Sequence, residues 1–294
     1  MTAIREHMAH GFAGLAAQIS PFWRFRLWAR MVGGDPYRQG APGAATPKII
    51  QPHGFEMELF EADWMERYAL RSGHFYQDEV VALMKQLVRP GQIVVDVGAN
   101  IGFVSLAASR QVGPQGRVFA FEPNSALVAR LRKSIRRNRI GNVAVFMTAL
   151  GERTGTVRLI AGGHHGTNRI SADDEENFGA GEVSLHRADD LLRDRLPAGL
   201  PAFVKIDVEG AELGVLKGMP ELLRRPRTRF FVELGDAHSA RFGHTAAAVF
   251  DLFHAEGYAA FRVRLSPFRA AIRLQAITGP VDKPVYDVLF MKAR

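Results

Sequence analysis

The sequence feature that most constrains the fold is the stretch from Ile93 to Leu106, where a short apolar run meets a glycine turn and then a helical pattern. Ile93–Val97 has the length and the β-branched composition of a buried strand. Gly98 and Gly102 allow backbone angles that other residues avoid, and they leave room for a ligand to approach the chain. A helix N-terminus after such a turn offers free N–H groups to a polar ligand. The stretch therefore predicts a strand–turn–helix unit of the kind that holds nucleotide-like cofactors at the carboxyl edge of a doubly wound sheet.

Residues in and after this turn indicate which cofactor is bound. The dinucleotide fingerprint G-x-G-x-x-G has a central glycine that lets the pyrophosphate lie on the backbone, whereas here Asn100 stands at that position. About 20 residues later, Glu122 follows the second apolar run, where a carboxylate can bind ribose hydroxyls. A ribose contact without a pyrophosphate cradle favours S-adenosylmethionine. The alternative is an ordinary turn whose glycines only shape the chain, and Glu122 argues against it.

Apolar runs and helical patterns alternate through the centre of the chain, separated by glycine- and proline-rich turns. Strands are predicted at residues 93–97, 117–122, 143–147, 156–160, 203–210, 230–234, 258–263 and 285–291, and the main helices at 124–138, 211–216 and 245–256. This alternation predicts an α/β fold with a mostly parallel, right-handed doubly wound sheet. The last two strands predict an antiparallel C-terminal edge.

Residues 1–52 are predicted to form an N-terminal helical appendage and linker, and residues 53–294 the main domain. Ser20 and Pro21 are typical of a helix start, and apolar side chains recur after them at helical spacing. Two interpretations of a helix at 20–32 stay open: it packs on the body or on a partner subunit, or it lies peripherally on an anionic membrane surface. Packing is favoured because so short an anchor binds a membrane only marginally. The sequence leaves the oligomeric state open.

The stretch at 161–182 is rich in glycine, histidine and acidic residues and has no periodicity. A loop of this length inside a compact domain is usually functional or disordered, and we interpret it as a lid or an acceptor-binding segment. His164 and His165 offer an alternative base, although adjacent loop histidines are more often simply solvated. The acidic residues at 173–175 add metal-ligand types, but the spacing fits no metal-site pattern, so no metal is predicted.

Composition narrows the setting in which the chain works. The absence of cysteine excludes disulfides and thiolate metal sites and fits a cytoplasmic location. No apolar run reaches the length of about 18 residues that spans a bilayer. The formal net charge of +8 can attract nucleic acid, anionic lipid or a phosphorylated substrate. Helical spacing places Arg130, Lys133 and Arg137 on one outer face, which favours ordinary solvated surface charge.

Two carboxylates stand where the fourth predicted strand ends. Asp207 and Glu209 follow a buried run, and the carboxyl end of a parallel strand points such side chains at the ligand crevice. Lys205 precedes Asp207 by two residues on the same side of the strand, so we interpret it as a buried partner for a carboxylate. Glu212 lies one turn into the next helix and can cap that helix near its N-terminal dipole.

Four segments, Asp96–Gly102, Phe121–Asn124, Ala149–Gly151 and Lys205–Glu212, have an order and spacing that resemble FkbM-type S-adenosylmethionine-dependent methyltransferases, and the similarity extends over residues 75–292. The resemblance implies a Rossmann-like class I methyltransferase sheet with S-adenosylmethionine as methyl donor. It also implies O-methylation of a hydroxyl on a sugar, glycoconjugate, polyketide or other natural product. One departure is Asp287, where the last strand of the family often carries asparagine, and this leaves the acceptor specificity open.

The segment Thr148–Gly151 is predicted to close the third strand at the edge where an adenine ring would lie. Methyl transfer to an alcohol needs in-line approach and removal of a proton. We therefore predict that Asp207 and Glu209 are catalytic, one as base and the other orienting the donor, with pure donor positioning as the alternative. The residues predicted to bind the donor are Asp96, Gly98, Asn100, Gly102, Glu122, Pro123, Asn124, Ala149, Leu150 and Asp207.

Two other functions compete with methylation of a small-molecule or glycan acceptor. A nucleic-acid methyltransferase would use the basic surface, but the chain has no Asn-Pro-Pro-Tyr-type motif and no basic–aromatic interleaving that could follow a single strand. A binding protein on a methyltransferase fold needs no catalytic groups. The intact glycines, Glu122 and the two strand-end carboxylates argue against that alternative.

Overall fold

The computed structural model describes residues 46–73, 75, 77–160, 168–172, 181–197, 202–265 and 272–292. The chain forms two compact units, one of Met1–Gln86 with Arg264–Arg273 and the other of Leu87–Val263 with Leu274–Arg294. The predicted helix at 20–32 lies outside the described residues, so that helix and the boundary after residue 52 remain predictions. Within the described part of the chain, no helix combines the length and apolarity that crossing a membrane requires.

The first unit consists of short strands and two helices that precede the main sheet. Its elements are β1 (Lys48–Ile50), the 3-10 turn η1 (Pro52–Gly54), β2 (Met57–Leu59), α3 (Trp64–Ser72) and α4 (Asp78–Leu87), and β1 pairs antiparallel with β2. Helix α3 begins where the Asp63 carboxylate accepts hydrogen bonds from the N–H groups of Met65 and Glu66. It ends at Gly73, whose left-handed φ of 70° closes the last turn.

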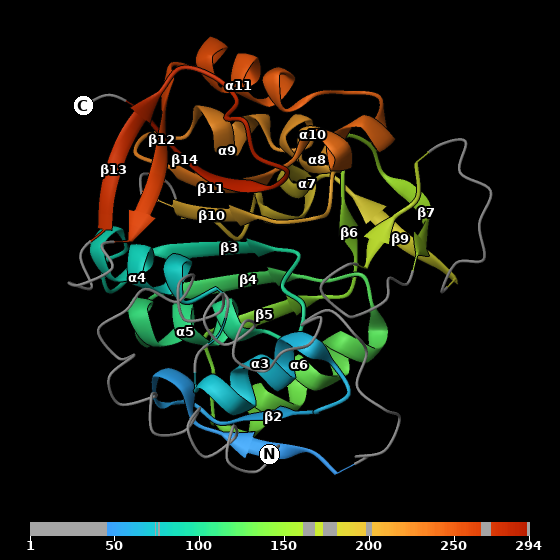
Figure 1. The fold of residues 1–294 in the computed structure, drawn as a ribbon, viewed down its shortest axis with the longest axis vertical. Coiled ribbons are helices and arrows are strands. Elements are labelled where there is room, and N and C mark those ends of the chain that lie inside the picture. Colours follow the sequence, from blue (N-terminus) through green and yellow to red (C-terminus); the bar gives the residue numbers. More distant parts are fainter. Residues whose placement is uncertain are drawn as a thin grey trace, which may run out of the picture. The chain divides into compact units, whose positions relative to one another are not determined.

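The second unit is built on an eight-stranded sheet in the order β13-β12-β14-β11-β10-β3-β4-β5. The strands are β3 (Ile93–Val97), β4 (Arg117–Phe121), β5 (Val143–Phe146), β10 (Ala202–Ile206), β11 (Arg229–Leu234), β12 (Tyr258–Leu265), β13 (Ile272–Ile277) and β14 (Tyr286–Lys292). Strands β5, β4, β3, β10 and β11 are parallel, and β14 runs antiparallel to β11 and β12 (Figure 1). The predicted doubly wound sheet with an antiparallel edge is confirmed, and β13 is a strand that the sequence did not predict.

Alternate residues along each strand enter different cores. Ile93, Val95 and Val97 share one hydrophobic cluster with side chains of the helices on that face. These helices are α7 (Ala188–Leu192), α8 (Glu212–Lys217), α9 (Pro220–Arg224) and α11 (Ala246–Ala255). The intervening Val94 and Asp96 point to the opposite face, where α5 (Phe103–Val112) contacts β3 and β4. Both faces of the central strands are therefore covered, as a doubly wound sheet requires.

Helix α6 (Ser125–Arg137) follows β4 and carries the basic residues that the sequence placed on one outer face. The Asn124 side chain caps its start by accepting hydrogen bonds from the N–H groups of Ala126 and Leu127. Its apolar face is buried, whereas Lys133 and Arg137 are exposed and Arg130 is half-buried. The basic side chains therefore lie on the outer side of α6, as their helical spacing predicted.

The second unit also contains a four-stranded sheet in the order β6-β9-β7-β8, which the sequence did not predict. It consists of β6 (Ala149–Leu150), β7 (Gly155–Ile160), β8 (Arg169–Ile170) and β9 (Gly181–His186). Figure 1 shows β6, β7 and β9 at the end of the central sheet toward which the parallel strands point. Of these strands, the sequence predicted the one at 156–160.

The structure corrects two expectations in this region. The third strand ends at Phe146, and Ala149–Leu150 pairs with β9 in the other sheet instead of closing the third strand. The chain changes sheets at Thr148, whose hydroxyl donates a hydrogen bond to the carbonyl of Ser184 in β9 at 2.8 Å. The stretch at 161–182 is also not a loop throughout. Its residues Arg169–Ile170 form β8, which pairs with β7, and β9 begins at Gly181. His164, His165 and residues 173–175 lie outside the described residues.

Candidate active site

The turn after β3 has the backbone that its glycines predicted. Gly98, Asn100 and Gly102 all have positive φ values, of 77°, 54° and 94°. A Cβ atom added at Gly98 would lie 1.9 Å from the carbonyl oxygen of Asp207, so this position has no room for any side chain. The N–H groups of Gly98 and Ala99 donate to the carbonyl of Phe121, at 3.0 and 2.9 Å, which fixes the turn against the end of β4. The turn is thus held between the carboxyl ends of β4 and β10.

The Glu122 carboxylate lies directly after β4 and is only 5% exposed. Its Oε2 accepts a hydrogen bond from the N–H of Asn100 and its Oε1 from the N–H of Asn124, each at 2.9 Å. Burial raises the pKa of Glu122, and these two backbone hydrogen bonds oppose that shift. A carboxylate can accept about four hydrogen bonds, so Glu122 can still accept from two hydroxyls. That remaining capacity suits the cis-diol of a ribose.

A buried ammonium group ties the turn to the end of β10. Lys205 Nζ lies 3.2 Å from Asp207 Oδ2, 3.6 Å from Asp96 Oδ1 and 3.2 Å from the Gly98 carbonyl oxygen, and both Lys205 and Asp96 are almost fully buried. Burial alone would lower the pKa of Lys205, but the carboxylates of Asp207 and Asp96 reverse the shift and raise it. Ser105, in α5, donates to the other oxygen of Asp96 at 2.6 Å. The predicted pairing of Lys205 with a carboxylate is confirmed, and it involves two.

The turn that follows β10 is built around Glu212. Its Oε1 accepts hydrogen bonds from the N–H groups of Val208 at 3.2 Å and Gly210 at 3.0 Å. Glu212 is the first residue of α8 and fixes the turn before that helix, whose N-cap residue, Ala211, has no side-chain cap, so the predicted capping role is not what the structure shows. Between Val208 and Gly210, Glu209 adopts a left-handed φ of 59°. Burial, reinforced by repulsion from Asp207 and Glu212, raises the pKa of Glu209 to about 8. Burial also raises the pKa of Glu212 to about 7. Carboxyl groups therefore crowd the end of β10.

Two further groups at this edge were not identified from the sequence. Glu233, in β11, and His238, in α10 (Asp236–Ser239), lie close to Glu209, and His238 Nδ1 is 3.3 Å from Glu209 Oε2. Asp287 of β14 is the register partner of Glu233, so both side chains leave the same face of the sheet. The available signal was strand alternation, because Glu233 lies two residues beyond Phe231, the register partner of Lys205.

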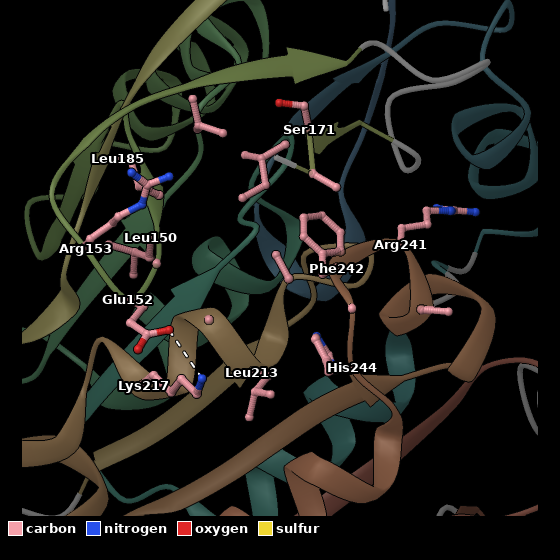
Figure 2. Close-up of a pocket in the computed structure, with 18 residues that line it drawn as sticks. Leu150, Glu152, Arg153, Ser171, Leu185, Leu213, Lys217, Arg241, Phe242 and His244 are labelled. Carbon is pink, nitrogen blue, oxygen red and sulfur yellow. Dashed lines mark ion pairs between the residues drawn. The ribbon is translucent and has the colours of Figure 1, made fainter. Parts of the chain in front are cut away.

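A pocket of about 850 Å³ opens between the four-stranded sheet, helix α8 and the 3-10 turn η3 (Ala240–Phe242). Figure 2 shows Leu150, Arg153 and Leu185 on one side of it and Arg241, Phe242 and His244 on the other, with Leu213 below. Glu152 and Lys217 form an ion pair at its rim, with 3.4 Å between Oε2 and Nζ. The His244 ring lies 3.0 Å from the Gly210 carbonyl oxygen, so the pocket borders the turn that carries the strand-end carboxylates.

Residues 96–260, more than half of the chain, match the family model described as the methyltransferase FkbM domain. The chain belongs to the FkbM methyltransferase family. Methyltransferase sdnD of Sordaria araneosa is 30% identical over 200 residues, which cover 56% of this chain and 76% of that protein. Hexuronic acid methyltransferase AglP of Haloferax volcanii is 29% identical over 184 residues, covering 61% and 71%. The 31-O-demethyl-FK506 methyltransferase FkbM of Streptomyces tacrolimicus is 31% identical over 163 residues, covering 46% of this chain and 62% of that protein.

For this FkbM family member, the structure brings most of the predicted site residues to one edge of the sheet. Asp96 is buried beneath the Gly98–Gly102 turn, Glu122, Pro123 and Asn124 follow β4, and Asp207 and Glu209 follow β10. Ala149 and Leu150 are buried in β6, and Leu150 lines the pocket. Whether these residues bind a methyl donor remains a prediction, as does a cytoplasmic location.

Proposed function

We propose that this FkbM family protein transfers a methyl group from S-adenosylmethionine to a hydroxyl oxygen of a sugar, glycoconjugate, polyketide or related natural product. The observation that carries the proposal is the environment of Glu122. Both of its oxygens are fixed by backbone N–H groups, from Asn100 and Asn124, and each keeps capacity for one more donor. A rigid acceptor group at the carboxyl edge of a doubly wound sheet is suited to holding the two hydroxyls of a ribose.

Other residues of this edge would complete a donor site. The N-terminus of α5 suits a polar group of the ligand. The absence of a Cβ at Gly98 lets the turn pack against β10. The apolar Leu150 at the pocket suits the adenine ring. S-adenosylmethionine supplies an electrophilic methyl group on a sulfonium. It needs no cradle for a pyrophosphate, in keeping with Asn100 at the centre of the turn.

The chain must then position a hydroxyl group and remove its proton. Of the two predicted catalytic carboxylates, we assign proton removal to Asp207 and acceptor orientation to Glu209. Glu209, with a pKa of about 8, holds its proton at neutral pH. Asp207 lies 3.2 Å from the ammonium of Lys205, which fixes its carboxylate at the strand end. A positioned base contributes about 10²–10⁴-fold to such a reaction.

We place the acceptor in the pocket between the four-stranded sheet and α8. The placement is supported by Ala211, which follows the turn with the strand-end carboxylates and lines this pocket. Its walls combine apolar side chains such as Phe242 and Leu213 with charged ones such as Arg241. Such a lining suits a hydroxylated natural product better than a flat aromatic or a purely apolar ligand. Two of the relatives are named as a hexuronic acid methyltransferase and a 31-O-demethyl-FK506 methyltransferase, names that fit a hydroxylated natural product as acceptor.

The test is methyl transfer by the full-length protein. Isotopically labelled S-adenosylmethionine is incubated with extracts containing glycans and small metabolites, and the labelled product is identified by mass spectrometry. We expect Asp207→Asn to reduce turnover by at least about 100-fold. Glu221→Gln, at an exposed carboxylate paired with Arg193, serves as the control and should keep full activity. No donor binding and no labelled product in the wild-type protein would overturn the proposal.

A further inference from the structure

Three side chains from separate elements converge beside the strand-end carboxylates. Glu209 comes from the turn after β10, Glu233 from β11 and His238 from α10, and one ligand atom from each lies within 4.8 Å of the other two. Two carboxylates and an imidazole, drawn together from distant parts of the sequence, are a donor set for a metal ion. We infer that Glu209, Glu233 and His238 bind a divalent cation of the magnesium and manganese type.

The fold holds these three groups in place before any ligand arrives. Gly210 has a φ of 116°, and a Cβ atom there would lie 2.4 Å from the carbonyl oxygen of His238. The absence of a side chain at Gly210 therefore lets α10 approach the turn and places the imidazole of His238 beside Glu209. Glu233 reaches the same point from β11, which pairs in parallel with residues 203–206 of β10.

The environment of Glu233 is the second observation that points to a ligand. Among the residues that the structure describes, none forms a hydrogen bond or an ion pair with its carboxylate. The ammonium of Lys205 lies nearby but is already in contact with Asp96 and Asp207. A carboxylate in such surroundings has a strong energetic reason to bind a cation.

The donor set indicates which cation is bound. Oxygen ligands favour magnesium and manganese, manganese also accepts an imidazole, and the absence of cysteine removes the thiolates that select soft metals. Opposite ligands of an octahedral ion lie about 4.2 Å apart at metal–oxygen distances of about 2.1 Å. Neighbouring ligands of such an ion lie about 3.0 Å apart, and His238 Nδ1 and Glu209 Oε2, at 3.3 Å, are already close to that distance. Three protein ligands leave the remaining positions of an octahedral ion for water or for the oxygens of a ligand.

The role of this cation in catalysis rests on the proposed function, whereas its binding does not. A cation that coordinates the acceptor hydroxyl lowers the pKa of that hydroxyl. The proton then passes to Asp207, the oxygen forms a bond to the methyl carbon, and the carbon–sulfur bond of the donor breaks. With the cation bound, Glu209 is a ligand and has lost its proton, and Asp207 remains the base.

Calorimetric titration of Mn²⁺ into the full-length protein, after treatment with a chelator, tests the inference. We expect one Mn²⁺ per chain, displaced by excess Mg²⁺. Glu233→Gln and His238→Gln should each weaken Mn²⁺ binding by at least about tenfold. Losing a residue that only orients a metal ligand already lowers metal affinity by about 10–100-fold, and losing the ligand itself should lower it at least as much. Glu221→Gln, an acid-to-amide change at an exposed site, should leave Mn²⁺ binding unchanged. The absence of binding at millimolar Mn²⁺, or equal binding by both ligand variants and the wild type, would overturn the inference.

Further measurements separate loss of the metal site from loss of the fold and from loss of donor binding. Circular dichroism shows whether each variant is folded, and broadening of the His238 imidazole signal by Mn²⁺ in the nuclear magnetic resonance spectrum of the wild-type protein reads the site without any variant. S-adenosylhomocysteine binding in the presence of chelator is measured separately. Donor binding without Mn²⁺ binding contradicts the metal site and leaves the proposed function standing. Mn²⁺ binding without donor binding supports the metal site and contradicts the proposed function.

Discussion

Replacing Lys205 by methionine removes a buried ammonium that contacts two carboxylates. Its Nζ lies 3.2 Å from Asp207 Oδ2 and 3.6 Å from Asp96 Oδ1. Asp96 is fully buried, and its Oδ1 has no hydrogen-bond partner among the described residues, because Ser105 donates to Oδ2. Methionine keeps the volume of the side chain but leaves the Asp96 carboxylate with no neighbouring positive charge.

The size of the effect follows from these distances. At an effective dielectric constant of about 20, each contact corresponds to roughly 5 kcal/mol of gross attraction, much of which offsets the cost of desolvating the ammonium. Removing one partner of a buried ion pair typically costs about 3–5 kcal/mol, and we expect Lys205→Met to lower the free energy of unfolding by that amount. Adding Asp96→Asn should recover at least about 1 kcal/mol, because a neutral amide needs no counter-charge.

Urea unfolding followed by circular dichroism measures this difference on the wild type, the single variant and the double variant. Lys217→Met is the matched control, since Lys217 is half-exposed and pairs with Glu152 at the surface, where an ion pair contributes about 0–1 kcal/mol. A loss below about 1 kcal/mol for Lys205→Met would refute the reasoning. So would a double variant in which the two losses simply add.

Four further results are expected. Glu122→Ala should weaken S-adenosylmethionine binding by at least about 100-fold in calorimetry, because two hydrogen bonds to a charged acceptor are lost; near-normal affinity would remove Glu122 from the donor site. Asn124→Ala should lower the free energy of unfolding by about 1 kcal/mol through loss of the α6 cap, which urea unfolding measures. Gly98→Ala should fail to bind the donor, since its methyl group would lie 1.9 Å from the Asp207 carbonyl oxygen, and normal binding would show that the turn is not rigid. The raised pKa of Glu209 means that folding favours its protonated form, so its contribution to stability should be lost as pH rises from 4.5 to about 8, and Glu209→Gln should flatten that dependence.

The parts of the fold that the sequence predicted are those with strong local patterns. The buried run Ile93–Val97 and the turn with Gly98 and Gly102 carry their own dihedral and packing signals. The pairing of Lys205 with a carboxylate follows from strand alternation. In each case the interacting groups are within a few residues of each other or on one strand.

The four-stranded sheet shows where local patterns stop being informative. Strands β6 and β8 have two residues each, too few to show any periodicity, so nothing in the sequence separates them from a loop. The sheet change at Thr148 depends on a hydrogen bond to Ser184, which lies 36 residues further along the chain. Such contacts are set by the packing of the whole unit and not by neighbouring residues.

The grouping of Glu209, Glu233 and His238 could not be predicted from the sequence for a related reason. Each residue by itself looks like an ordinary polar residue after or within a strand. Their convergence requires the register of β10 with β11 and the close approach of α10 to Gly210, neither of which can be read from composition or spacing. Asp287 is noted in the sequence only as a departure from the family pattern. The antiparallel register of β14 with β11 places it opposite Glu233.

The claim that S-adenosylmethionine lies at the carboxyl edge of the sheet, with its ribose on Glu122, is tested most directly by a crystal structure of the full-length protein with S-adenosylhomocysteine. We predict that both ribose hydroxyls donate to the Glu122 carboxylate and that the sulfur faces Asp207. A ligand bound elsewhere on the protein, or ribose hydroxyls that do not contact Glu122, would contradict the account.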